Sequence, residues 1–134
     1  MIMPNFSVLS EVKLKTCHYD IQTVIRTVIQ RIDFSIIWGH RGNELQQQLY
    51  ESGFSDKKAG ESKHNLMPSE AIDIAPYPIN WEDKKRFYYL AGMVMMTAWE
   101  LNIKLRWGGD WNMNDNLNDQ KLFDLGHFEL FKTE

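Results

Sequence analysis

Three residues in two short motifs carry side chains that together can bind a metal ion. His64 and Asp73 belong to one stretch of the chain, Ser-Lys-His followed by Ala-Ile-Asp, and His127 ends the sequence Asp-Leu-Gly-His. Two imidazoles and one carboxylate are a ligand set for a catalytic zinc ion, which keeps its fourth coordination position for water. This set predicts hydrolytic chemistry.

A pair of predicted strands can aim two of these ligands into one cleft. The alternation over 71–75 predicts a strand in which Asp73 faces away from the neighbouring isoleucines. A second strand is predicted over 127–131 and begins with His127. If the strands are neighbours, these two ligands face the same cleft, and His64 can join them from a polar loop.

Two acidic residues near His127 are expected to have different roles. Asp124 lies three residues before His127, and a turn through Leu-Gly would bring its carboxylate beside the metal without making it a ligand. That is the position of a general base for hydrolysis. Glu129 is interpreted as a structural partner outside the coordination shell, because a fourth protein ligand would close the site to water.

The remaining pattern predicts an α+β fold, in which helices pack on a small, mainly antiparallel sheet with the zinc cleft on its open face. Helices are expected over 20–32, 44–50 and 80–102, with Asp20 and Asn80 as N-caps, strands also over 34–38 and 105–107, and a polar loop over 55–68. In the last helix, a core stripe is expected from Phe87, Leu90, Ala91, Val94, Met95, Ala98 and Leu101, and its many methionines are interpreted as core residues.

Composition excludes several classes of protein. A length of 134 residues with 43% hydrophobic residues predicts one domain over 1–134 with a real core. The net charge of −3 and the pI near 5.8 argue against a nucleic-acid partner. No apolar stretch reaches the length of a membrane span, and the N-terminus lacks the pattern of a signal peptide. Because Cys17 is the only cysteine, a metal must be held by His and carboxylate side chains.

Several motifs from about Trp38 onward fit the pattern of one enzyme family. They are Gly39-His-Arg41 followed by Gln46, Leu49-Tyr50 and Gly53, then Ser62-x-His64, Ala71-x-Asp73-Ile74, Arg106-Trp-Gly-Gly-Asp-Trp111 and Asp124-x-x-His127-Phe-Glu-Leu130. Together these motifs resemble the zinc peptidases of the D-alanyl-D-alanine carboxypeptidase type, and among them the phage L-alanyl-D-glutamate endopeptidases. One departure is the longer segment 65–70 between the first histidine and the aspartate.

The resemblance implies that His64, Asp73 and His127 bind one zinc ion, that Asp124 is the catalytic base, and that Arg41 holds substrate or the developing oxyanion. A planar guanidinium can grip a carboxylate or an oxyanion through two bonds, although a surface salt bridge is the alternative role for Arg41. The implied function is hydrolysis of the L-alanyl-D-glutamate bond in peptidoglycan stem peptides during host cell lysis. We expect a monomer that stays in the host cytoplasm until a separately encoded pore releases it to the cell wall.

Further polar and aromatic residues have open roles. Ser62, Trp107 and Asp110 are candidates for substrate contacts. Ser62 can also anchor the ligand loop, and Trp107 with Trp111 can form either an apolar wall or part of the core. The loop 110–119 alternates oxygen-bearing side chains as a calcium site does, yet it lacks the expected glycine and glutamate, so a plain polar loop is the alternative.

Two other functions remain open at this level. A D-alanyl-D-alanine carboxypeptidase would use the same metal centre and differ only in its pocket walls. A zinc-stabilised binding module without turnover, as in the related hedgehog signalling domains, is the non-enzymatic alternative, and the presence of Asp124 argues against it. Cys17 and His18 are adjacent and are not expected to act as a nucleophile and base pair, and His40 is left without a role.

Overall fold

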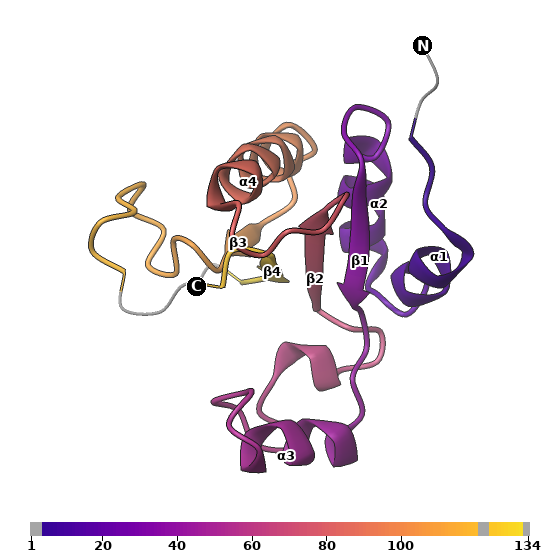
Figure 1. Cartoon of the computed structure of the whole chain (residues 1–134), viewed down its shortest axis with the longest axis vertical. Coiled ribbons are helices and arrows are strands. Elements are labelled where there is room, and N and C mark those ends of the chain that lie inside the picture. The colour runs from indigo at the N-terminus through magenta and orange to yellow at the C-terminus, as the bar shows by residue number, and fades with distance from the viewer. Residues whose placement is uncertain (1–3, 121–123, 133–134) are drawn as a thin grey trace.

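A four-stranded antiparallel sheet with strand order β1-β2-β4-β3 lies at the centre of the fold (Figure 1). The structure, a computed structural model, describes residues 4–120 and 124–132. The strands are β1 (Phe34–Trp38), β2 (Ala71–Pro76), β3 (Leu105–Trp107) and β4 (His127–Leu130). The helices are α1 (Val8–Leu14), α2 (Tyr19–Val28), α3 (Asn43–Glu51), the 3-10 helix η1 (Lys63–Asn65) and α4 (Lys84–Glu100). These elements confirm the predicted α+β fold.

Strand β2 lies between β1 and β4, and its register decides where the ligands meet. Ile72 and Ile74 are fully buried in the core, as the alternation predicts. Asp73 on the other face is paired with His127 in the antiparallel register of β2 and β4. The two predicted strands are therefore neighbours, and they bring two of the three ligands opposite each other.

The helices surround the sheet and enclose one apolar core. Helix α4 packs on β2 and β3, α2 packs on α4, and α1 packs against β1. Helix α3 lies beyond one end of the sheet, at the bottom of Figure 1, and the chain returns from it through η1 to β2. The largest fully buried side chains include Phe34, Phe128, Leu14, Ile21, Ile25, Ile72, Ile74 and Leu90.

Both expected helix caps are wrong. His18, and not Asp20, is the N-cap of α2, because its Nδ1 accepts a hydrogen bond from the backbone N–H of Asp20 at 3.0 Å. Asn80 lies in a turn that precedes α4, where its side chain accepts the backbone N–H of Glu82 at 3.1 Å. In both places another local hydrogen bond competes with the expected cap.

Helix α4 is shorter than expected, and α1 was not predicted. Leu101 follows the end of α4 and is 42% exposed, so it does not continue the core stripe. Met96 is 56% exposed, which shows that not every methionine of this helix is a core residue. Across the described residues, every helix is too short or too polar to span a membrane.

Candidate metal centre

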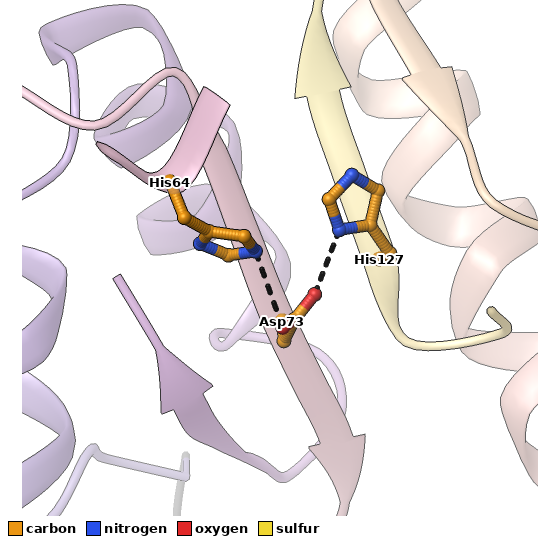
Figure 2. A group of neighbouring side chains, drawn as sticks. All are labelled: His64, Asp73 and His127. Carbon is orange, nitrogen blue, oxygen red and sulfur yellow. Dashed lines mark hydrogen bonds and ion pairs between the residues drawn. The ribbon is translucent and has the colours of Figure 1, made fainter. Parts of the chain in front are cut away.

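His64, Asp73 and His127 come together from η1, β2 and β4, as Figure 2 shows. Each offers one ligand atom, and these atoms all lie within 4.8 Å of one another. The Asp73 carboxylate lies between the rings, with Oδ2 at 3.2 Å from His64 Nε2 and Oδ1 at 2.9 Å from His127 Nδ1. Among the described residues, this is the group of histidine, cysteine and acidic side chains that could hold a metal ion.

The outer nitrogen of each imidazole is bound by the protein. His64 Nδ1 donates to the Gly39 carbonyl at 2.8 Å, and His127 Nε2 donates to Glu129 Oε1 at 3.0 Å. Donation from these atoms leaves His64 Nε2 and His127 Nδ1 as the inward-facing ligand atoms, which is the usual arrangement of metal-bound histidines. His64 Nε2 is buried without a hydrogen-bond partner among the described residues, so the site fits a metal ion.

Asp73 and His127 shift each other's pKa because they lie in direct contact. Burial disfavours ionisation of Asp73, but its hydrogen bond with His127 and the nearby His64 ring hold the pKa of its carboxyl well below the usual range. Burial would also lower the pKa of His127, yet its bonds to Asp73 and Glu129 raise that pKa to about 9. Metal binding at Nδ1 therefore displaces a proton, as it does whenever a metal replaces a proton on a ligand.

Local hydrogen bonds fix the segment that carries His64. The Ser62 hydroxyl accepts the backbone N–H of His64 at 3.1 Å, and Ser62 and Asn65 together form a capping box around η1. A Cβ atom at Gly39 would lie 2.3 Å from the Lys13 carbonyl oxygen, so only glycine allows this approach. Ser62 thus anchors the ligand loop, and a role for it in substrate binding stays a prediction.

Arg41 is buried beside the three ligands and is only 8% exposed. Its Nη1 donates to Gln46 Oε1 at 3.0 Å, and its Nη2 lies 3.6 Å from Asp73 Oδ2. The guanidinium carbon lies 4.6 Å from the centre of the Trp38 ring. Burial lowers the pKa of Arg41 while Asp73 and Asp124 raise it. The structure therefore places a fixed cation at the metal centre and not in a surface salt bridge.

Gln46 fixes the Arg41 guanidinium through a hydrogen bond. Its side chain is fully buried, accepts from Arg41 and from Asn65 at 3.4 Å, and donates to Ser55 and to the Lys57 carbonyl. The amide thereby joins α3 to the segment that carries His64. Only the motif match pointed to Gln46, because a glutamine in a polar helix otherwise predicts a solvent-facing residue.

Asp124 lies at the edge of the same site. A turn over Asp-Leu-Gly-His, closed by a hydrogen bond from the His127 N–H to the Asp124 carbonyl at 3.1 Å, brings the Asp124 carboxylate to 4.0 Å from His127 Nδ1. The Asp124 side chain is 56% exposed. Partial burial and repulsion from Asp73 raise the pKa of Asp124, against the attraction of His127, His64 and Arg41. A carboxylate in this position can reach water beside the ligands without being one of them.

Comparison with known proteins identifies the family. Residues 2–131 match the family model described as phage L-alanyl-D-glutamate peptidase. The chain is also 35% identical over 130 residues to the L-alanyl-D-glutamate peptidase of Escherichia phage T5, covering 90% of this chain and 93% of that protein. The chain belongs to the phage L-alanyl-D-glutamate peptidase family.

A solved structure supports this membership of the phage L-alanyl-D-glutamate peptidase family. The Serratia marcescens L-Ala D-Glu endopeptidase ChiX superposes with a TM-score of 0.76 at 27% sequence identity, covering 95% of this chain and 90% of that one. The family resemblance inferred from the motifs is therefore confirmed, and so is the fold that it implies.

Of the other aromatic and acidic candidates in this family member, Trp111 contacts a ligand, whereas Trp107 and Asp110 line a separate cavity. Trp107 is 8% exposed and donates from Nε1 to the Leu125 carbonyl, so most of its ring belongs to the core. Its remaining surface and Asp110 line a cavity of about 400 Å³ between α4 and the following loop. The Trp111 ring lies against His127, with 5.3 Å between the ring centres. Substrate contacts of Trp107 and Asp110 stay a prediction.

The loop over 110–119 is organised by its own hydrogen bonds. Asp110 accepts the backbone N–H groups of Asn114 and Asp115 at 3.3 and 3.0 Å, and Asp119 accepts from the Asn114 side chain at 2.5 Å. Asn114 and Asn116 each accept the backbone N–H two residues further on at 2.9 Å, as in Asx turns. Within the described residues, the one His, Cys, Asp and Glu group suited to a metal is that of His64, so a calcium site in this loop has no support.

Proposed function

We propose that this protein is a zinc metallopeptidase that hydrolyses the L-alanyl-D-glutamate bond of peptidoglycan stem peptides. Membership of the phage L-alanyl-D-glutamate peptidase family supports the substrate. The observation that carries the chemistry is the convergence of His64, Asp73 and His127, with the Asp124 carboxylate 4.0 Å from His127 Nδ1. This arrangement has three ligands and a separate base, as hydrolytic zinc sites require.

The residues divide the reaction between them. His64 Nε2, Asp73 and His127 Nδ1 would hold zinc, which supplies Lewis acidity toward the scissile carbonyl and toward water. Asp124 takes the proton from the attacking water and returns it to the leaving amine. Its side chain is 56% exposed, so water can reach it beside the ligands.

Arg41 supplies the fixed positive charge. Its Nη2 faces Asp73 and its Nη1 is held by Gln46, so the guanidinium is oriented before substrate arrives. We propose that it binds a substrate carboxylate or the developing oxyanion, since a preorganised cation in a buried site needs no rearrangement during the reaction. The stem peptide carries the free carboxylate of D-glutamate, which fits such a cation.

The biological setting is part of the same proposal. We propose that the enzyme acts as a monomeric endolysin, is made in the host cytoplasm, and reaches the cell wall through a separate pore. Lysis by the purified protein added to outer-membrane-permeabilised cells, without lysis when it is expressed alone inside intact cells, would agree with this route. Lysis upon expression alone would contradict the need for a pore.

Digestion of purified muropeptides followed by mass spectrometry tests the bond directly. A new N-terminal D-glutamate is expected, and a chelator should abolish its formation while added zinc restores it. Release of terminal D-alanine would instead indicate a carboxypeptidase. Absence of any cleavage with stoichiometric zinc bound would indicate a binding module, and full activity in metal-free protein would overturn the zinc assignment.

A further inference from the structure

The outer side of His127 carries a cluster of three charged side chains from three elements. Glu129 belongs to β4, Arg106 to the neighbouring strand β3, and Lys63 to η1. Glu129 Oε2 lies 2.8 Å from Arg106 Nη2 and 3.3 Å from Lys63 Nζ. We call these three residues the Glu129 cluster. None of them belongs to the ligand set or to the residues assigned to catalysis above.

The two oxygens of Glu129 have separate partners. Oε1 accepts a hydrogen bond from His127 Nε2 at 3.0 Å, while Oε2 accepts one from Arg106 and forms an ion pair with Lys63. The side chain is 11% exposed, so few solvent contacts compete with these bonds. The carboxylate is therefore held on both sides.

Lys63 also connects two segments that carry ligands. It precedes His64 directly in η1, and its Nζ donates to the Leu130 carbonyl in β4 and forms an ion pair with Glu129. Strand β4 begins with His127. A single side chain thus links the loop that positions one ligand to the strand that positions another.

We propose that Glu129 is a positioning residue for His127, held in place by Lys63 and Arg106. By accepting from Nε2, it holds the His127 ring with Nδ1 facing the other two ligands, and its cations prevent it from turning away. Carboxylates behind metal-bound histidines have this effect, and their loss weakens metal binding by roughly 10- to 100-fold. The inference deepens the proposed function and rests on its zinc site.

Zinc affinity and the tautomer of His127 test the proposal without any measurement of activity. The zinc dissociation constant is measured by competition with a chelator, and the protonated ring nitrogen of His127 by long-range ¹H–¹⁵N NMR of the zinc-loaded protein. Glu129→Leu should weaken zinc binding by roughly 10- to 100-fold and mix the His127 tautomers. Glu129→Gln keeps an acceptor oxygen and should lose less than about tenfold.

Lysine variants test whether the cations act through Glu129. Lys63→Met should weaken zinc binding several-fold, while Lys57→Met, at an exposed lysine of the same connecting segment, should leave it unchanged. In the Glu129→Leu background, the effect of Lys63→Met should shrink, because its carboxylate partner is gone. If Glu129→Leu does not fold, Glu129→Gln and Lys63→Met carry the test.

Wild-type zinc affinity within about twofold in Glu129→Leu, with an unchanged tautomer, would overturn the positioning role. An unchanged tautomer and affinity in Glu129→Gln and Lys63→Met would do the same if Glu129→Leu is unfolded. These results would leave the proposed function intact as long as the wild type binds zinc and cleaves muropeptides. A wild type that binds no zinc would overturn both proposals.

Discussion

Substitution of Gly126 by alanine should disturb the register that brings the ligands together. Gly126 lies directly before His127, and its carbonyl accepts the backbone N–H of Ile74 at 2.9 Å. A Cβ at this position would lie 2.2 Å from the Ile74 carbonyl oxygen, whereas ordinary contact begins at 3.4 Å. The two backbones must therefore separate by about 1.2 Å, the difference between these distances.

The expected magnitude follows from the two effects of this separation. Overpacking costs about 1–3 kcal/mol, and a weakened backbone hydrogen bond adds about 1 kcal/mol. We expect the free energy of unfolding to fall by roughly 2–4 kcal/mol and the Tm by on the order of 10 °C. A displacement of about 1 Å at His127 and Asp124 should also lower kcat/KM by roughly 100-fold in the variant that remains folded.

Urea denaturation of the zinc-free protein measures the stability change, and Gly92→Ala provides a matched control. Gly92 lies inside α4, where an added Cβ meets no atom within 4 Å, so the same substitution should stabilise the protein by roughly 0.5–1 kcal/mol. A Gly126→Ala variant as stable as wild type would refute the argument from close approach. Equal destabilisation by both substitutions would refute it as well.

Further predictions follow from the surroundings of Asp124, Arg41 and Cys17. Asp124→Asn should retain stoichiometric zinc by elemental analysis but lose at least roughly 100-fold in muropeptide hydrolysis, and a near-normal rate would assign the base elsewhere. Arg41→Lys should lower kcat/KM by roughly 30- to 150-fold with zinc content intact, because one ammonium cannot serve both Gln46 and the cleft; unchanged kinetics would make Arg41 structural. Cys17 is 2% exposed, and burial raises its pKa to about 12, so iodoacetamide should label it far more slowly in native than in urea-unfolded protein at pH 9. Fast labelling of the native protein would contradict this burial. The native thiol keeps its proton above the ordinary pKa of 9.0, so its contribution to the free energy of unfolding should be complete below pH 9 and fall as the pH rises toward 12. Urea denaturation at several pH values measures this fall.

The directions in which Asp73 and Asp124 face could be predicted because they depend on short patterns. Strand alternation sends Asp73 away from Ile72 and Ile74, and the Asp-Leu-Gly-His turn needs only local geometry to bring Asp124 beside His127. Burial of one face fixes the strand register, since a shift by one residue would expose both isoleucines. The sequence therefore contained enough information for these parts of the site.

Helix α1 could not be predicted in the same way. The Ser7 hydroxyl caps α1 by accepting the Ser10 N–H, but the helix spans only seven residues and exposes Val8, Leu9 and Val12. Such a helix is marginal by itself, and its packing against β1 stabilises it. The Ser10 hydroxyl accepts the Ile36 N–H of that strand at 3.0 Å, a contact between distant parts of the chain that no local pattern reveals.

The partners that surround the ligands were also beyond the reach of the sequence. In the sequence, Lys63 and Arg106 look like ordinary surface residues, and their side chains are 34% and 32% exposed. Their contacts with Glu129 depend on the pairing of β3 with β4, which places Arg106 opposite Glu129, and on the return of the chain through η1. Charge alone could not distinguish them from lysines and arginines that face only water.

The metal centre is consequently tied to the fold by its least local contacts. Asp73 and His127 lie on paired strands, and the backbone approach at Gly126 holds the turn that carries Asp124 against β2. His64 belongs to a separate segment, but its Nδ1 is bound to Gly39 at the end of β1. Because His64 and His127 are each held by a hydrogen bond from outside the ligand set and Asp73 lies on a paired strand, zinc binding should stabilise the native state without rebuilding it. Chelation should therefore lower the Tm while leaving the far-UV circular dichroism below the transition unchanged, and loss of that signal on chelation would show that the metal also organises the fold.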